Sequence, residues 1–440
     1  MASAYHYPPR EELLRTAVGE TPRGVKLASM ALALIGLLVF VAGLFLAPDR
    51  AWQAVHFNWL FFTTISSAGV MFVAVQRITT ARWSRPVVRF LEGYVAWLPI
   101  AWIILLLIVT VGQGHIFSWT HETPPVDEKV FYFGEGFFLL RVLGFYTIIV
   151  ALSIWYIYTS VRLDVGLVPE AGASWARGLR ERMRRGFGEE RRELHSTHSR
   201  QGKLAVFLVL FFAYGWSSLS YDLSMSLSLH FQSTMYGWQF FMGGFLGSLV
   251  TWNLITRWYD KQYNLGNLVT ETTYHDLGKL AFAFAAFWGY LTFGQYIIIW
   301  YGNLPEETHF FRLRLLHPWM GITTAVGVLM FVVPFFGLMG KKPKIWAPWI
   351  IGVSVCVTIG LWLHRYIEVY PSIYGETGSL PFGLWEIGVT LGFLGLWGLS
   401  YLSFMEAFPR LRVTMMSSPY RDEVQVPVDP KTMEPLPAHE

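Results

Sequence analysis

The sequence predicts an all-α, polytopic membrane protein with about ten transmembrane helices. The chain of 440 residues is 53% hydrophobic, 17% aromatic and only 15% charged, whereas soluble domains carry about 25% charged residues. A bilayer core of roughly 30 Å requires about 20 apolar residues in each spanning helix. Apolar windows of that length recur along the chain, centred on residues 27–46, 55–76, 94–113, 138–160, 203–222, 236–256, 279–301, 318–338, 346–366 and 383–404.

The loops between these windows predict the orientation of the helices. Cytoplasmic loops of membrane proteins carry an excess of Lys and Arg, and every second loop here is basic, as are both tails. Arg312 and Arg314 form the one basic cluster in an expected outer loop. We therefore expect both the N-terminus and the C-terminus on the cytoplasmic side of the membrane.

The basic loop in the middle of the chain divides the expected helices into two groups. An N-terminal tail at 1–26 precedes helices one to four at 27–162, and helices five to ten at 203–404 precede a C-terminal tail at 405–440. The loop at 163–202 lies between the two groups. Its run RGLRERMRRGFGEERREL fits either an amphipathic helix on the membrane surface or a solvated linker.

The ends of the third and seventh expected helices resemble each other. Gly112-Gln113 precedes Trp119 in the first, and Gly294-Gln295 precedes Trp300 in the second. Since four helices separate the two segments, both run in the same direction across the membrane. A parallel repeat of two four-helix bundles, helices 2–5 and 6–9 with helices 1 and 10 as flanking helices, explains this spacing. Chance similarity between apolar segments is the alternative.

The cysteine content limits the cofactors that this chain holds alone. Cys356 is the single cysteine, and the sequence contains no Cys-x-x-Cys-His. We therefore expect no c-type haem and no iron–sulfur cluster ligated by this chain alone, and we assign no metal site.

Asp222 follows the apolar run of the fifth expected helix, and it lies within the membrane if that helix continues to Leu229. Charged groups in spanning helices cost about 2.5–3.5 kcal/mol each at the helix centre, which makes each a functional candidate. Tyr221, Ser217 and neighbouring serines surround Asp222 in sequence, and hydroxyl groups can pass protons between water and a buried carboxylate. An interfacial acid paired with a basic neighbour is the alternative.

Arg141 enters the fourth expected helix six residues after Glu135. That spacing is too long for an ion pair between neighbouring turns. Arg141 must therefore find another carboxylate or extend toward the interface. We include both residues among the proton-path candidates.

Four histidines, His56, His115, His317 and His364, lie near the expected outer ends of helices two, three, eight and nine. Histidines at a shared depth can bind a quinol head group or ligate a b-type haem, and interfacial histidines with ordinary hydrogen bonds are the alternative. Gln295 is either a relay group or an amide that bridges helices.

Two segments resemble the NrfD-like, polysulfide-reductase-type membrane subunits, including the F subunits of bacterial alternative complex III. The segments are YDLSMSLSLHFQSTMYGW at 221–238 and FGQYIIIWYGNLPEET at 293–308. Leu223 stands where the family has a Trp after the Asp, and His230 or Phe231 stands at its second Trp. The matching positions are Asp222, Met225, Ser226, Leu227, Ser233, Thr234, Gly237, Gln295, Tyr296, Trp300, Asn303, Pro305, Glu306 and Glu307.

The resemblance implies a subunit of a respiratory quinol:electron-acceptor oxidoreductase in a bacterial cytoplasmic membrane. Such a subunit conducts protons and binds no cofactor alone, while partner subunits hold the iron–sulfur clusters and c-type haems. The implied partners are a homologous integral subunit, an iron–sulfur protein, c-type cytochromes and lipids, and quinol or menaquinol is the implied substrate.

Three functions therefore follow as expectations. In the first, Asp222 loads protons and Tyr221, Ser217, Gln295 and His56 relay them. In the second, this chain forms the quinol site itself, with His115, His317 or His364 accepting the quinol proton. In the third, the parallel repeat forms a secondary transporter with helices interrupted at corresponding positions of both halves.

Overall fold

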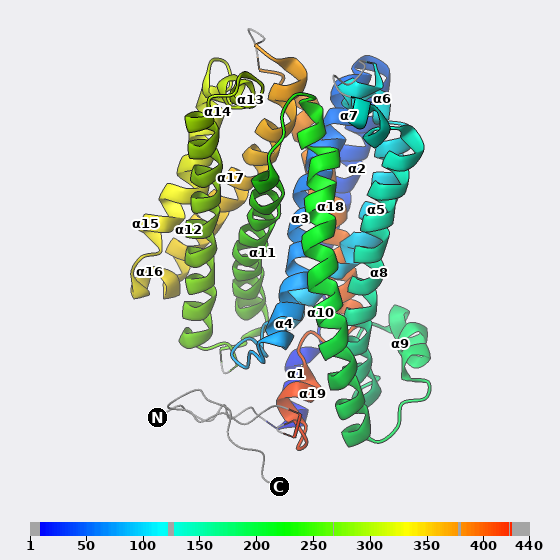
Figure 1. Ribbon diagram of the computed structural model, residues 1–440. Helices are drawn as coiled ribbons and strands as arrows, with labels where there is room; N and C mark the ends of the chain where they lie inside the picture. Colours follow the sequence, from blue (N-terminus) through cyan, green and yellow to red (C-terminus); the bar gives the residue numbers. More distant parts are fainter. Residues whose placement is uncertain (1–8, 122–126, 267, 377–379, 422, 425–440) are drawn as a thin grey trace.

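The computed structural model describes residues 9–121, 127–266, 268–376, 380–421 and 423–424, and the regular structure within these ranges is helical. Figure 1 shows long helices that run side by side along one axis. Eight of them are continuous: α2 (Arg23–Leu46), α3 (Pro48–Ile78), α8 (Glu135–Leu167), α10 (Glu190–Leu223), α11 (Thr234–Tyr263), α12 (Glu271–Gly302), α17 (Ala347–Tyr374) and α18 (Leu384–Ala407).

Two further passes change helix type along their length. One joins α4 (Val88–Glu92), the 3-10 helix η1 (Gly93–Trp97) and α5 (Leu98–Thr110). The other joins α14 (Met320–Gly327), the π-helix η5 (Val328–Val332) and α15 (Val333–Gly337). These irregular turns occupy the second helix of the first bundle and the third helix of the second, so they do not lie at corresponding positions.

Short helices cover the two ends of the molecule (Figure 1). We call the end with α1 and α19 the terminal end, and the end with α6, α7 and α13 the distal end. The short helices are α1 (Arg10–Ala17), α6 (Gln113–Ile116), η2 (Ser118–Thr120), α7 (Asp127–Tyr132), η3 (Ser174–Ala176), α9 (Arg177–Arg184), η4 (Met225–Leu227), α13 (Pro305–Leu315), α16 (Lys341–Ile345) and α19 (Val413–Ser417).

The chain is a multi-pass membrane protein. Within the described residues, nine helical segments are long and apolar enough to cross a membrane. α11 is a tenth long helix that runs from one end of the molecule to the other. It connects the distal end, where α10 ends, to the terminal end, where α12 begins (Figure 1). It is less apolar because it contacts α3, α10, α12 and α17, so that Ser248, Asn253 and Thr256 are buried in protein and not in lipid.

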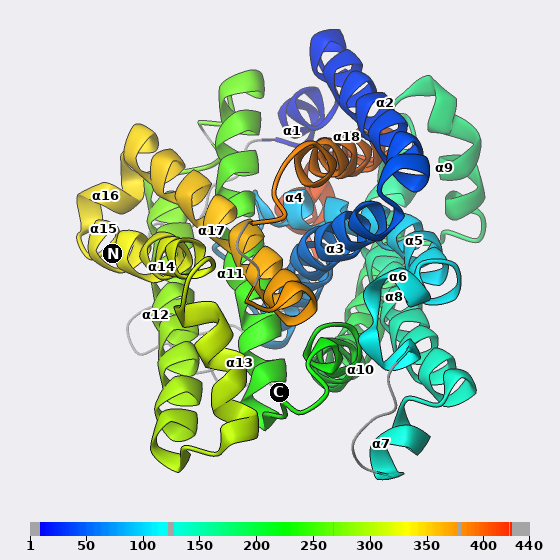
Figure 2. The same ribbon diagram turned by 90° about the horizontal axis from the view of Figure 1, so that it is seen from above.

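The helices form the two expected four-helix bundles. α3 and α8 contact each other and both α5 and α10, and α11, α12, α14–α15 and α17 form the second group. The bundles meet where α3 and α10 pack against α11, and Figure 2 shows α3 near the middle of the molecule. Every residue of α3 from Ala51 to Ala74 is buried, so this helix faces protein on all sides.

The flanking helices α2 and α18 pack against each other beside the first bundle (Figure 2). A Cβ atom on Gly36 would lie 2.0 Å from the Cα atom of Gly392. Gly388 and Gly392 have the spacing of a small-residue motif that lets two membrane helices approach closely. Since α18 also contacts α3 and η1, the pair is attached to the first bundle.

The central loop differs from its expected extent of 163–202. α8 continues to Leu167 and α10 begins at Glu190, so helical structure covers much of this loop. Arg162 on α8 donates to Glu193 on α10 over 2.7 Å, and this ion pair holds the two helical extensions together. The charged run contains α9 and the first turn of α10.

The two glutamines that suggested a repeat occupy different local structures. Gln295 lies inside α12, whereas Gln113 begins the short helix α6 after α5 has ended. The helix α12 therefore continues past Gln295, whereas α5 ends before Gln113.

Candidate functional site

A buried ion pair joins the distal ends of α8 and α10. Arg141 donates from Nε and from Nη2 to the two carboxylate oxygens of Asp222, each over 2.8 Å. The Asp222 side chain is fully buried and the Arg141 side chain is 8% exposed. Asp222 is thus the carboxylate that Arg141 finds, while Glu135 lies exposed at the first position of α8.

The short helix α7 covers this ion pair. The Arg141 guanidinium lies 3.6 Å from the centre of the Tyr132 ring and donates to the Tyr132 carbonyl oxygen over 3.1 Å. Lys129 donates to the carbonyl oxygen of Leu229 over 2.6 Å. Burial raises the pKa of the Tyr132 phenol above its usual value, and the negative charge of Asp222 raises it further, so the phenol keeps its proton.

His56 on α3 contacts the same segment. Its Nε2 atom lies 2.6 Å from the carbonyl oxygen of Leu223, the residue that follows Asp222. The imidazole is fully buried, and its Nδ1 atom has no hydrogen-bond partner in the described part of the chain. The structure therefore brings His56 to the Asp222 segment, with one ring nitrogen available.

Tyr221 and Ser217 do not join this group. The Tyr221 hydroxyl donates to the carbonyl oxygen of Thr234 over 2.8 Å, and the Ser217 hydroxyl donates to that of Ala213 over 2.8 Å. Ser217 instead lies where α10 and α11 approach closely, because a Cβ atom on Gly237 would be 3.0 Å from it. Both side chains support helix packing.

A large cavity lies in the second bundle between α11, α12, α13, α14–α15 and α17. Its volume is about 860 Å³, and most of its lining residues are apolar, including Phe293, Phe331 and Phe335. The polar residues of the lining are Gln239, Thr292, Gln295, Arg314, Thr323, Thr324, His364 and Glu368. An apolar cavity with a few convergent polar groups is typical of a small-molecule site.

His364 and Glu368 provide the ionisable pair of this cavity. The Nδ1 atom of His364 lies 3.5 Å from Oε1 of Glu368, and neither atom has a hydrogen-bond partner among the described residues. Arg365 donates to the other oxygen, Oε2, over 2.5 Å, and the Trp288 ring meets His364 edge to face. A donor and an acceptor are therefore available to a hydroxyl-bearing ligand.

Arg314 and Gln295 hold the wall of the same cavity. Arg314 donates to the carbonyl oxygens of Ile367 and Glu368 over 2.9 and 3.1 Å. Arg314 is buried against α17 and does not add to the surface charge of its loop. Its burial explains why an arginine occurs in a loop that we expected to be poor in Lys and Arg. Gln295 donates to the Ser233 hydroxyl over 2.9 Å and so bridges α12 to the start of α11.

The four histidines are not gathered at one place. The Nδ1 atom of His115 pairs with Asp49 over 2.6 Å near the distal surface, and His317 is exposed between α13 and α14. His56 and His364 are buried in different bundles. No group of three or more His, Cys, Asp or Glu in the described ranges could hold a metal ion.

Sequence reasoning missed the cavity and its acid. The expected ninth helix ended near residue 366, which left Glu368 in an outer loop, but α17 continues to Tyr374 and Glu368 is 3% exposed. α17 continues beyond its apolar window because α3 packs against it, and Phe57 on α3 contacts Tyr370 in this extension. Three ionisable residues, His364, Arg365 and Glu368, within two turns of one apolar helix are the signal that could have found the site.

Comparison with models of known protein families finds no match for this chain, and comparison with curated proteins finds none either. The features of the chain that bear on its function are the buried ion pair, His56 and the cavity of the second bundle.

Proposed function

We propose that this chain is an integral membrane subunit of a respiratory quinol:electron-acceptor oxidoreductase of the alternative complex III type, and that its first bundle conducts protons. The observation that carries the proposal is the fully buried Asp222 carboxylate, which Arg141 holds, with His56 bound to the carbonyl oxygen of the next residue, Leu223. Taking two charges out of water costs several kcal/mol for each ion. Ionisable groups retained inside a membrane protein are therefore functional candidates.

The ion pair can operate as a proton-controlled gate. A proton that reaches Asp222 neutralises the carboxylate and weakens its hold on Arg141, because the Coulomb attraction between the two charges is lost. The guanidinium then keeps its contacts with Tyr132. Loss of the proton restores the pair, and the buried, unpartnered Nδ1 atom of His56 is the further group that we assign to proton exchange.

The buried helix α3 supports a path beyond this gate. It carries polar side chains from the distal end to the terminal end, and Ser67 and Gln76 have buried polar atoms without partners in the described structure. The buried polar residues are Gln53, His56, Asn58, Thr63, Thr64, Ser66, Ser67 and Gln76. Between Ser67 and Gln76 the helix is apolar, so conduction along it requires water.

The proposed electron carriers belong to partner subunits. A single cysteine, Cys356, cannot ligate an iron–sulfur cluster alone. We propose an iron–sulfur protein, c-type cytochromes and a homologous integral subunit as partners, in a bacterial cytoplasmic membrane with both chain ends in the cytoplasm. The basic loops at the terminal end support this orientation.

Purification of the tagged full-length chain from its own membranes tests the subunit assignment. We expect iron–sulfur and c-type haem proteins in the purified assembly, detected by electron paramagnetic resonance and by haem absorbance. Recovery of the chain as a monomer that takes up a solute would overturn the assignment and favour a secondary transporter.

A second candidate function is quinol binding by this chain in the cavity of the second bundle. The unpartnered Nδ1 atom of His364 and the unpartnered Oε1 atom of Glu368 favour it, since a quinol hydroxyl needs an acceptor for its proton. The apolar remainder of the cavity suits an isoprenoid tail. In this alternative His364 is the quinol ligand, and His115 and His317 have no part in the site.

A further inference from the structure

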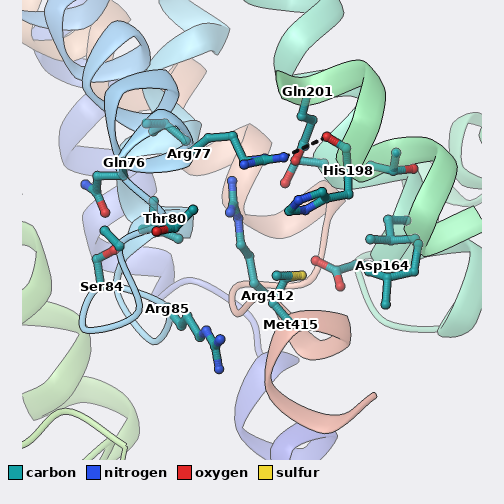
Figure 3. A pocket seen from close by; sticks show the side chains of 17 residues that line it. Gln76, Arg77, Thr80, Ser84, Arg85, Asp164, His198, Gln201, Arg412 and Met415 are labelled. Atoms are coloured by element: carbon teal, nitrogen blue, oxygen red, sulfur yellow. Dashed lines mark hydrogen bonds between the residues drawn. The ribbon is translucent and has the colours of Figure 1, made fainter. Parts of the chain in front are cut away.

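A small polar cavity lies at the terminal end of the first bundle (Figure 3). It has a volume of about 50 Å³ and lies where the ends of α3 and α8 meet the start of α10 and α19. One water needs roughly 10–15 Å³ of such volume, so the cavity has room for a group of several atoms. Its polar lining is Gln76, Arg77, Thr80, Ser84, Arg85, Ser160, Asp164, Thr197, His198, Gln201 and Arg412.

A charge-balanced cluster adjoins this cavity and contributes Asp164 and Arg412 to its lining. Arg89 pairs with both Glu92 and Asp164, and Arg412 pairs with Glu92. The second oxygen of Asp164 accepts hydrogen bonds from the backbone and hydroxyl of Thr414 over 2.8 and 2.6 Å. Two guanidinium groups and two carboxylates thus neutralise one another and leave no negative charge for a further cation.

Arg77 is a positive charge beyond this balance. Its Nη2 atom donates to the carbonyl oxygen of His198 over 2.9 Å. Among the described residues, Arg77 forms no ion pair with a carboxylate, because the nearby carboxylates pair with Arg89, Arg162 and Arg412. Its Nε atom is buried without a partner. Figure 3 shows the Arg412 side chain extending toward Arg77, so that two guanidinium groups face the same small space.

A partly buried, uncompensated cation beside a second guanidinium needs an anion. We propose that this cavity binds a tetrahedral oxyanion of the phosphate type, supplied by a phospholipid headgroup or by free phosphate. Guanidinium groups suit such an anion because their planar N–H donors match its oxygens in pairs. The hydroxyls of Thr80 and Ser84 and the amide of Gln201 line the cavity as further donors.

The position of the cavity favours a headgroup source. It lies at the end of the membrane-spanning helices with the basic loops, and basic pockets between helices at the cytoplasmic surface bind anionic headgroups. A bound oxyanion would connect the end of α3, through Arg77, to α10 and to Arg412 before α19. The inference requires no quinol chemistry and stands independently of the proposed function.

Thermal unfolding of the purified full-length chain, with the subunits that it retains, tests the proposal. We expect inorganic phosphate, or nanodiscs that contain phosphatidylglycerol in place of phosphatidylcholine alone, to raise the unfolding temperature of the wild type. Arg77→Gln should weaken the apparent affinity at least tenfold. Arg184→Gln, an exposed arginine on α9, should leave it unchanged.

The two ligands distinguish the sources. Stabilisation by phosphate at millimolar concentration assigns a free oxyanion, and stabilisation by phosphatidylglycerol alone assigns a headgroup. Wild-type protein that responds to neither ligand, or an Arg77→Gln variant that responds as wild type does, would overturn the proposal. If Arg77→Gln does not fold, Arg77→Lys keeps the charge but loses the paired donors, and it should bind more weakly than wild type.

Discussion

Arg141 and Asp222, 81 residues apart in sequence, meet through two hydrogen bonds of 2.8 Å between the guanidinium and the carboxylate. The pair closes the contact between α8 and α10 at the distal end of the first bundle, and its carboxylate is fully buried. A buried pair of this geometry fixes the position of both charges and leaves each strongly dependent on the other.

Removing one partner should therefore destabilise the protein more than removing both. Arg141→Gln leaves Asp222 buried without a counter-charge, which costs about 3–5 kcal/mol in other buried pairs. We expect thermal unfolding in detergent to show a large loss for Arg141→Gln and partial recovery in the double variant with Asp222→Asn.

Arg312→Gln is the matched control. Its ion pair with Glu376 spans 3.6 Å, and the two side chains are 66% and 57% exposed, so its loss should cost about 0–1 kcal/mol. Equal unfolding temperatures for Arg141→Gln and Arg312→Gln would contradict a structural role for the buried pair.

The contact between α2 and α18 should be sensitive to a single added methyl group. A Cβ atom at Gly392 would lie 2.7 Å from the Cα atom of Gly36, so Gly392→Ala must push the two helices apart. We expect a destabilisation of about 1–3 kcal/mol, as for other overpacked contacts, measured by thermal unfolding in detergent.

Gly24→Ala, on the same helix as Gly36, has no neighbouring atom within 4 Å of the new Cβ. It should be neutral or slightly stabilising, because alanine favours a helix more than glycine does. A Gly392→Ala variant as stable as Gly24→Ala would show that α2 and α18 are not packed as closely as described.

The cavity of the second bundle should bind a quinone analogue if this chain forms a quinol site. A photoreactive quinone should then label Phe310, Phe331 or other lining residues. Glu368→Gln should weaken labelling about tenfold to a hundredfold, since a hydrogen bond to a charged group contributes about 1.5–3 kcal/mol. Glu376→Gln, exposed near the same end of α17, is the control. Labelling confined to partner subunits would remove the quinol alternative for this chain.

Much of the fold could be predicted from the sequence because a helix that spans the lipid bilayer needs about 20 apolar residues. Apolar windows predicted the all-α class and the position of α11, and the similarity of the segments around Gln113 and Gln295 predicted the grouping of helices. Helix ends were less predictable: α10 begins 13 residues before its apolar window does, because an ion pair between Arg162 and Glu193 extends it beyond the membrane. α17 runs past its window because protein, not lipid, surrounds Glu368.

The candidate site was predictable only in part. Asp222, Arg141 and His56 were recognisable as ionisable groups in apolar segments, but their meeting depends on how α3, α8 and α10 pack. Tyr221 and Ser217 are neighbours of Asp222 in sequence and yet hydrogen-bond to backbone carbonyls. The surplus charge of Arg77 could be recognised only after the partners of Arg89 and Arg412 were known.

The ratio of protons translocated to electrons transferred tests the central claim most directly. It should be measured for Asp222→Asn in the assembled complex, reconstituted in liposomes with quinol and its electron acceptor. Asparagine has nearly the size of aspartate but cannot carry the proton. The account predicts a lower ratio, with electron transfer reduced or uncoupled from proton movement. An assembled Asp222→Asn complex with unchanged turnover and an unchanged ratio would contradict it.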